Sequence, residues 1–326
     1  MSPSRLTPVE LEVARHALAG IAEEMGVALR RASYSPNIKE RADCSAALFD
    51  RDGQMVAQAE HIPVHLGSMP ASVTAVLEAF GGELGPGQQA AVNDPYAGGT
   101  HLPDLTIVAP VWQDGRLLGY VANRAHHADV GGAAPGSMPA DAVDIAMEGL
   151  RVPPTLVADE HGVRADVLGL IAANSRTPHE RLGDLRAQFA ANHVGAVRLH
   201  ELAARWDPDR LAHTMREVCD YSDRRVRAAT RRIPDGTYQF ADQLEVGDGG
   251  FRSWCRTRCW SEAPRRRIAP GTGSRSPTIM SSKTFAAGST TCSPRWSRPM
   301  AGSRLESGVP CSSSAGSTEW RPASAT

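Results

Sequence analysis

The 326-residue sequence contains no long hydrophobic run, and no stretch approaches the roughly 20 apolar residues that a membrane-spanning helix needs. Its N-terminus, MSPSRLTPVELEVARH, lacks the apolar segment of a signal peptide. We therefore expect a cytoplasmic protein with no membrane partner. The sequence also lacks the GxxxxGK[ST] and GxGxxG motifs, so it shows no phosphate-binding loop of its own.

Net charge is nearly absent as well: the formal value of −1 gives no indication of a nucleic-acid partner. This average hides a change of composition near residue 250. The last 76 residues carry 11 Arg and one Lys against three Glu, with 16 Ser, four of the six Cys and four of the six Trp. They contain only four Leu, Ile or Val and no His, so two different kinds of sequence join there.

Several interpretations of this C-terminal tail compete. A disordered basic tail usually avoids Trp and Cys, and a nucleic-acid-binding arm usually groups its arginines. A zinc site would start from Cys255 and Cys259, with no nearby His to complete it. A shifted reading frame explains the composition best. We therefore predict a domain over residues 1–246, followed by an aberrant tail of low order over residues 247–326.

The stretch around which the remaining sequence is organised runs from Asn93 to Pro139, NDPYAGGTHLPDLTIVAPVWQDGRLLGYVANRAHHADVGGAAPGSMP. Two runs rich in apolar residues, LTIVAPVW and RLLGYVAN, flank Gln113-Asp114-Gly115. An Asp-Gly pair between two such runs is a strong signal for a β-hairpin. Because a hairpin returns the chain to its starting level, residues before and after it are expected at one end of the ribbon.

Histidine and aspartate side chains stand at both ends of this hairpin. They are His101 and Asp104 before it, and His126, His127 and Asp129 after it. Neutral imidazole and carboxylate are suitable ligands for Mn²⁺, Fe²⁺ or Zn²⁺, and neighbouring glycine pairs allow close backbone approach. Either Asp–His pair alone could be a hydrogen-bonded loop brace. Two such clusters at one end of a ribbon predict a shared metal or catalytic site.

The motifs NDPYAGGTHLPD and NRAHHADVGGAAPGSMP resemble the hydantoinase B/oxoprolinase family, and the likeness extends more loosely from about Leu11 to about Leu244. This family includes N-methylhydantoinase B subunits, the matching half of 5-oxoprolinases, and the large subunits of acetone and acetophenone carboxylases. The resemblance implies a metal-bearing subunit that acts on a cyclic amide or ketone substrate. It also implies that ATP is handled by a partner subunit of the hydantoinase A/oxoprolinase type.

Carried over residue by residue, the resemblance implies roles for individual side chains. The implied metal residues are His101, Asp104, His126 and Asp129, and the choice between His126 and His127 as ligand stays open. His127 and Asp94 are the expected catalytic residues, while Asn93, His65 and Arg151 are expected to contact the substrate. A structural salt bridge is an equally good interpretation of Arg151. The segment NIKERAD places Glu40, Arg41 and Asp43 near the same site, unless they only form salt bridges within a loop.

The rest of the sequence predicts a mixed α/β class (α+β), with β-hairpins and a mixed sheet packed with long helices. A helix is expected after Thr7-Pro8, and two more after Thr177-Pro178 and from Pro208 to about Arg231. A second hairpin is expected around Arg51-Asp52-Gly53. Another helix is expected to start at Ser68-Met69-Pro70, because Pro63 argues against a regular helix that holds both His61 and His65.

Three functional hypotheses follow. The first is a B-type subunit of an ATP-dependent cyclic-amide hydrolase (hydantoinase or 5-oxoprolinase) or of a related carboxylase. The second is a truncated or frameshifted remnant of such a subunit, without catalytic activity. The third is a metal-dependent hydrolase that acts alone and needs no ATP.

Overall fold

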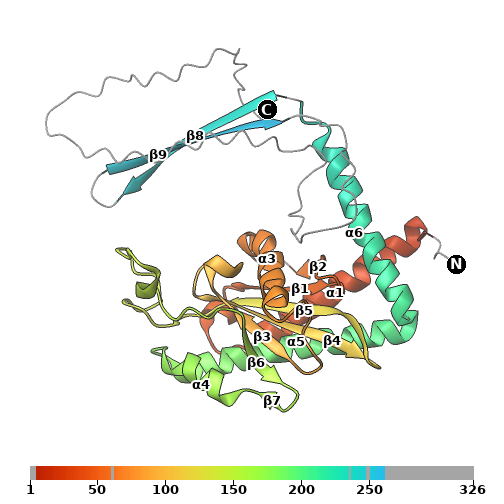
Figure 1. The fold of residues 1–326 in the computed structure, drawn as a ribbon, viewed down its shortest axis with the longest axis horizontal. Coiled ribbons are helices and arrows are strands. Elements are labelled where there is room, and N and C mark those ends of the chain that lie inside the picture. The colour runs from red at the N-terminus through yellow and green to blue at the C-terminus, as the bar shows by residue number, and fades with distance from the viewer. Residues whose placement is uncertain (1–4, 60–61, 235, 247–249, 261–326) are drawn as a thin grey trace. The chain divides into compact units, whose positions relative to one another are not determined.

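The computed structural model describes residues 5–59, 62–234, 236–246 and 250–260. These residues form two compact units, one that ends at Arg232 and one that begins at Ile233. The first unit is a β-sheet with helices packed on both faces (Figure 1), which confirms the predicted mixed α/β class.

The sheet of the first unit has seven strands in the order β2-β1-β5-β4-β3-β6-β7. The strands are β1 (Cys44–Phe49), β2 (Met55–Ala59), β3 (Gln89–Val92), β4 (Asp104–Gln113), β5 (Arg116–His126), β6 (Thr155–Asp159) and β7 (Gly162–Val163). Each neighbouring pair is antiparallel, whereas we expected a mixed sheet. The predicted hairpins around Arg51-Asp52-Gly53 and Asp114-Gly115 are both confirmed, as β1–β2 and β4–β5.

The helices are α1 (Pro8–Ala32), α2 (Pro36–Lys39), α3 (Pro63–Ala79), α4 (Ala165–Ala173), α5 (Pro178–Trp206) and α6 (Pro208–Thr230), with short 3₁₀ turns η1 (Pro95–Ala97) and η2 (Ile145–Met147). Helix α1 begins with the predicted capping box, in which Thr7 and Glu10 exchange hydrogen bonds. The predicted starts of α5 and α6 are also confirmed.

Helix α3 begins at Pro63 rather than at Ser68, so this prediction was wrong. Proline suits the first turn of a helix, because its missing N–H needs no intrahelical partner there. His65 therefore lies inside the first turns of α3, while His61 lies outside the described residues.

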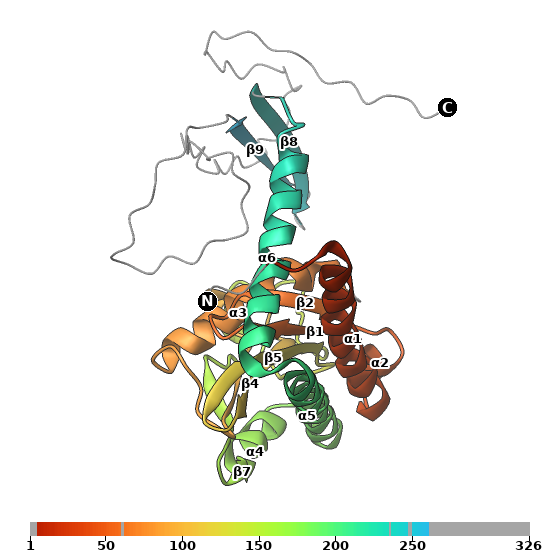
Figure 2. The ribbon, with the colours of Figure 1, turned by 90° about the vertical axis from the view of Figure 1, so that its right-hand side faces the viewer.

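Alternation along the strands divides the core into two layers. Val73 and Val76 of α3 pack on Phe49, Val92 and Tyr120 on one face of the sheet. On the other face, helices α1, α5 and α6 cover Leu48 and Val121. Figure 2 shows α1 and α5 side by side on this second face, and residues of the two helices are in contact. We call the two surfaces of the sheet the α3 face and the α5 face.

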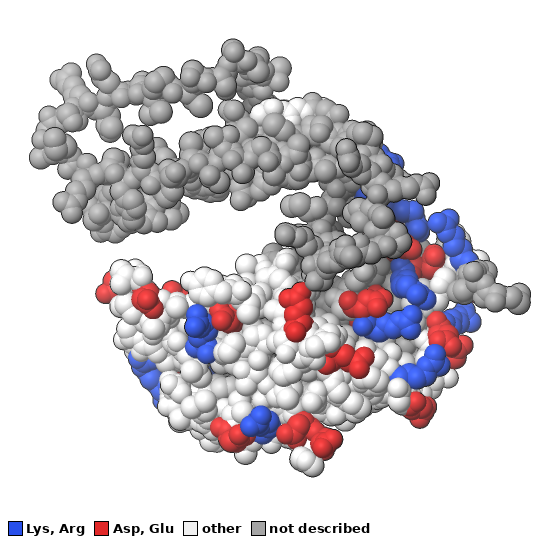
Figure 3. All heavy atoms as spheres, viewed as in Figure 1, with Lys and Arg blue, Asp and Glu red and all other residues white. Residues whose placement is uncertain are grey.

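The second unit contains a hairpin in which β8 (Gly236–Val246) pairs with β9 (Gly250–Trp260) along its whole length. Regular structure thus continues past residue 246, where the sequence predicted the domain to end. The rest of the predicted tail, residues 261–326, lies outside the described residues. In the described part of the chain, no helix is both long enough and apolar enough to cross a membrane. Figure 3 shows acidic and basic side chains interspersed on the visible face of the first unit.

Candidate metal centre

The β4–β5 hairpin sets the geometry of the site. Asp114 and Gly115 both adopt positive φ angles, 49° and 73°, as a two-residue type I′ turn requires. With this turn fixed, the pairing register places Asp104, at the start of β4, directly opposite His126, at the end of β5. The sequence-based expectation that the hairpin brings its two ends together is confirmed for these residues.

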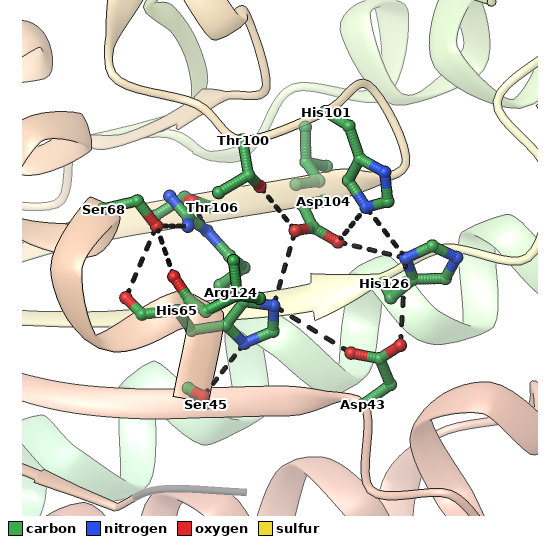
Figure 4. A network of polar contacts seen from close by, with 12 residues as sticks. Asp43, Ser45, His65, Ser68, Thr100, His101, Asp104, Thr106, Arg124 and His126 are labelled. Atoms are coloured by element: carbon green, nitrogen blue, oxygen red, sulfur yellow. Dashed lines mark hydrogen bonds and ion pairs between the residues drawn. The ribbon is translucent and has the colours of Figure 1, made fainter. Parts of the chain in front are cut away.

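Three side chains converge at this end of the hairpin (Figure 4). Asp104 Oδ1 lies 2.8 Å from His101 Nε2 and 3.1 Å from His126 Nδ1, and the two ring nitrogens lie 3.1 Å apart. One ligand atom from each residue lies within 4.8 Å of the others, close enough for all three to hold one metal ion. The predicted residues His101, Asp104 and His126 are therefore brought together.

The carboxylate of Asp104 is nearly inaccessible to solvent, with a side-chain exposure of 3%. Burial acts to raise its pKa, but hydrogen bonds with His101 and His126, together with the nearby ring of His65, outweigh this and hold the pKa well below its usual range. The same hydrogen bond to Asp104 raises the pKa of His101. The group therefore concentrates negative charge on a buried oxygen that faces two imidazole nitrogens.

His65 and Asp43 complete the surroundings of Asp104. His65 Nε2 lies 3.4 Å from Asp104 Oδ2 and 3.9 Å from Asp43 Oδ1, while Asp43 Oδ2 lies 3.9 Å from His126 Nδ1. On the other side of its ring, His65 Nδ1 lies 2.9 Å from the Ser45 hydroxyl oxygen. His65 is thus placed beside the carboxylate of Asp104, although we expected it to contact substrate.

A fully buried arginine, Arg124, lies next to this group on β5 and was not foreseen from the sequence. Its guanidinium donates hydrogen bonds to three hydroxyl groups, those of Thr106 on β4 and of Ser68 and Ser72 on α3. Burial lowers the pKa of Arg124 to about 10, so it remains charged at neutral pH. It ties the start of α3, which carries His65, to the strands that carry Asp104 and His126 (Figure 4).

The loop that delivers His101 packs directly on α3. Gly98 has a φ of 82°, and a Cβ atom there would come within 2.5 Å of the Ala71 carbonyl. Its own carbonyl accepts a hydrogen bond from the Ser72 hydroxyl at 2.6 Å. The glycine is thus required for contact between loop and helix, while the sequence suggested contact with a ligand.

His127 lies on the opposite, α5 face of the sheet, although it follows His126 directly. Its Nδ1 accepts a hydrogen bond from Arg181 at 2.6 Å, and its Nε2 lies 2.9 Å from Gln188 Oε1. Complete burial, together with the nearby positive charge of Arg181, lowers its pKa well below the usual range. The structure does not bring His127 to the cluster, so it offers no support for a catalytic role.

Asp129 does not join the cluster either. Its carboxylate accepts hydrogen bonds from the backbone N–H groups of Gly131 and Gly136 and from Arg176, whose guanidinium lies 2.9 Å away. These donors hold its pKa below the usual value against the effect of burial. In this structure the carboxylate fastens the loop after β5, whereas we expected it to bind the metal.

Asn93 and Asp94 are occupied by contacts within the protein. The amide of Asn93 donates to the carbonyl oxygens of Leu102 and Leu150 and accepts from the backbone N–H of Val152. The Asp94 carboxylate accepts from the N–H of Tyr96 and lies 3.7 Å from Arg151 Nε. Both side chains brace the loop before β4, and the catalytic role of Asp94 and the substrate contact of Asn93 stay predictions.

Arg151 is half exposed and lines a cavity of about 550 Å³. The wall of this cavity also includes Gly131 and Gly132, Ile145 and Asn174. Its guanidinium is therefore available to an anionic group, as the sequence suggested, while it also forms the alternative ion pair with Asp94.

The site's donor set fits a divalent transition-metal ion. Two imidazole nitrogens and a carboxylate oxygen converge, and this combination suits Zn²⁺, Mn²⁺ or Fe²⁺. Beside this group, the buried His65 Nε2 has no hydrogen-bond partner, which is uncommon for a buried polar atom and calls for an explanation. A proton shared between His101 and Asp104 would be the simplest alternative occupant.

Comparisons with known proteins identify the family of this chain. The sequence matches the family described as hydantoinase B/oxoprolinase over residues 7–261. It is 36% identical over 244 residues to the caprolactamase subunit beta of Pseudomonas jessenii, covering 75% of this chain and 42% of that protein. It is 35% identical over 259 residues to 5-oxoprolinase of Saccharomyces cerevisiae, covering 76% of this chain and 20% of that protein.

Two solved structures also resemble this chain. The crystal structure of the ATP-dependent caprolactamase from Pseudomonas jessenii matches with a TM-score of 0.71 and 34% identity, over 77% of this chain and 44% of that chain. A nucleotide-free acetone carboxylase matches with a TM-score of 0.70 at 19% identity, covering 77% of this chain and 35% of that chain, which shows a shared fold. This chain spans less than half the length of these relatives. It belongs to the hydantoinase B/oxoprolinase family.

Proposed function

We propose that this chain is the metal-binding part of a B-type subunit of an ATP-dependent enzyme that hydrolyses cyclic amides or carries out a related carboxylation. The observation that carries the proposal is the convergence of His101, Asp104 and His126 on one point at the end of the β4–β5 hairpin. The names of its relatives, an ATP-dependent caprolactamase and a 5-oxoprolinase, supply the reaction class.

In this proposal, His101, Asp104 and His126 hold one divalent ion. The carboxylate of Asp43, 3.9 Å from His126 Nδ1, adds negative charge beside them. A divalent ion at such a site polarises a substrate carbonyl or lowers the pKa of a bound water. Arg151 offers a half-exposed guanidinium to an anionic part of the substrate from the wall of the neighbouring cavity.

ATP would be handled by a partner subunit of the hydantoinase A/oxoprolinase type. Two observations support a partner. The sequence has no phosphate-binding motif of its own, and a related protein is described as a beta subunit. The substrate would then reach the His–Asp site after its carbonyl oxygen has been activated in the partner.

Metal content tests the site directly. We expect about one equivalent of Zn²⁺, Mn²⁺ or Fe²⁺ in the purified chain by elemental mass spectrometry, and its loss in His101→Ala and in His126→Ala. His161→Ala is the matched control, because His161 is well exposed in the short turn between β6 and β7 and should not affect binding. Unchanged metal content in both site variants would rule out this ligand assignment.

Activity tests the reaction class. The chain is combined with a hydantoinase A-type subunit, and ring opening of hydantoin, 5-oxoproline and caprolactam is followed with and without ATP. The proposal expects turnover only with ATP and the partner. Turnover by the chain alone, without nucleotide, would instead support a metal-dependent hydrolase that acts by itself.

A second candidate is a non-catalytic remnant of such a subunit. The observation that favours it is the change of composition after residue 250, together with a family match that ends at residue 261. Translation of the gene in all frames downstream of codon 244 tests it. A continuous family-like sequence in another frame favours the remnant, whereas its absence from all frames argues against a shifted frame.

A further inference from the structure

Among the described residues, His65 is the one buried histidine beside the cluster whose use is not explained by metal binding at His101, Asp104 and His126. Its side chain is 1% exposed, and it enters the site from α3 rather than from the hairpin. Its Nε2 has no hydrogen-bond partner, although it lies only 3.4 Å from Asp104 Oδ2. A buried polar nitrogen without a partner is unfavourable because its lost contacts with water are not replaced, so a use for it is expected.

Two uses are open to this nitrogen. It can bind the ion through its lone pair, or it can carry a proton and donate it to the carboxylate of Asp104. The set of ligand atoms that lie mutually within 4.8 Å contains His101, Asp104 and His126 but not His65. Within the described residues, His65 therefore stands outside the group that surrounds the candidate ion.

The two oxygens of Asp104 have different neighbours (Figure 4). Oδ1 faces the ring nitrogens of His101 and His126. Oδ2 faces the other way, where it accepts a hydrogen bond from the Thr100 hydroxyl and lies beside His65 Nε2. One oxygen thus belongs to the metal side, and the other is held by the protein.

We propose that Ser45 and His65 form a relay that orients Asp104 for metal binding, with His65 as a positioning residue and not as a ligand. This inference rests on the proposed function. The Ser45 hydroxyl donates to His65 Nδ1, now 2.9 Å away, and this leaves the ring proton on Nε2. The Nε2–H group then donates to Asp104 Oδ2. This requires the distance between the two atoms, 3.4 Å in this structure, to shorten to the roughly 2.7–3.2 Å of an N–H···O bond.

The surroundings of His65 make this relay rigid. Arg124 donates to Ser68 and Ser72, which lie one and two turns after His65 on α3. Ser45 lies on β1, next to β5, so both ends of the relay are anchored to the sheet. Hydrogen bonds that orient a metal-binding carboxylate commonly change metal affinity by about 10–100-fold.

The first test uses the wild-type chain and needs no metal. Nitrogen-15 NMR of the metal-free protein reports which ring nitrogen of His65 carries the proton. The relay requires the Nε2–H form, and a ring protonated at Nδ1 alone would overturn it. This measurement does not depend on whether the chain binds an ion, so its failure is distinct from failure of the proposed function.

The second test titrates metal-free variants with Zn²⁺ and Mn²⁺. We expect His65→Leu and Ser45→Ala to weaken binding by about 10–100-fold, and His65→Gln to recover most of the loss because its amide can still donate to Asp104. Ser45→Ala removes a single hydroxyl, so it should fold even if His65→Leu does not. Equal affinity in wild type, Ser45→Ala and His65→Leu would overturn the relay.

X-ray absorption of the Zn²⁺-loaded chain distinguishes the two uses of His65. The relay expects two imidazoles on the ion in the wild type and the same two in His65→Gln. Three imidazoles in the wild type, falling to two in His65→Gln, would make His65 a ligand and overturn the positioning role. A wild-type chain that binds neither ion would overturn the proposed metal site itself.

Discussion

The two faces of the central sheet treat neighbouring histidines in opposite ways. On the α5 face, each hydrogen-bonding atom of His127 has a partner, Arg181 at Nδ1 and Gln188 at Nε2. On the α3 face, His126 Nδ1 converges with His101 Nε2 on the same carboxylate oxygen. His127 is thus fully paired on one face, whereas two imidazole nitrogens meet one carboxylate oxygen on the other.

The surroundings of the two histidines differ in the same way. On the α5 face, the amide of Gln188 also donates hydrogen bonds to Asn123 and to the Leu105 carbonyl, and Arg181 forms an ion pair with Asp184. Such a network, in which both ring nitrogens of His127 have partners, stabilises one packing arrangement. The group around Asp104 holds two nitrogens close to one buried oxygen, an arrangement that a cation stabilises.

The largest loss of stability should come from Arg181→Met on the α5 face. This change leaves the fully buried carboxylate of Asp184 without its cation, and breaking such a pair typically costs about 3–5 kcal/mol. We expect the free energy of unfolding, measured with urea, to fall by that amount. The metal content of the protein that remains folded should not change.

Arg124→Met is the matched control on the α3 face. Arg124 is equally buried, but its hydrogen-bond partners are three neutral hydroxyls, so a smaller loss of about 1–3 kcal/mol is expected. A loss from Arg124→Met as large as that from Arg181→Met would contradict the distinction between the two networks.

The next effect separates the adjacent histidines. His127→Ala leaves Arg181 and Gln188 each short of one partner, so the metal-free chain should lose about 1–3 kcal/mol of unfolding free energy. His126→Ala should change the metal-free chain less, because it removes one of two nitrogens that share Asp104 Oδ1. It should instead abolish the extra stability that saturating Zn²⁺ gives the wild type, about 2.7 kcal/mol at 100 times Kd.

Thermal unfolding with and without Zn²⁺ checks both variants. If His127→Ala lost the metal-dependent gain in melting temperature and His126→Ala kept it, the assignment of the metal to the α3 face would be wrong.

Much of this arrangement was predictable because it depends on local chemistry. The Asp-Gly turn and the flanking apolar runs predicted the hairpin, and its register then placed Asp104 opposite His126. The choice between His126 and His127 was not predictable in the same way. Alternation along a strand puts them on opposite faces, but only the packing of α3 and α5 decides which face holds the site.

Which residues of α5 are buried was not predictable from the sequence either. His193 of α5 is exposed, whereas the buried face of this helix carries Arg181, Asp184, Gln188 and Asn192. Polar residues in a helix are usually exposed, so nothing local marks these four as buried. Their burial depends on partners from distant segments, such as the N–H groups of Tyr34 and Ser35 that bond to Asp184.

The smallest predicted effect concerns Asp129, which the sequence assigned to the metal and the structure sets against Arg176. Asp129→Asn keeps the size of the side chain and one acceptor oxygen for the N–H groups of Gly131 and Arg176. It removes the charge that pairs with the Arg176 guanidinium and the oxygen that accepts from the N–H of Gly136. Because Arg176 is 40% exposed, solvent screens much of this pair, and the free energy of unfolding should fall by about 1 kcal/mol or less.

Zn²⁺ affinity, measured by titration of the metal-free chain, should stay within about threefold of the wild type, since no change in ligands is expected. Arg176→Gln should reproduce the same small loss of stability. A fall in Zn²⁺ affinity seen only in Asp129→Asn would return Asp129 to the ligand set and extend the site beyond the α3 face.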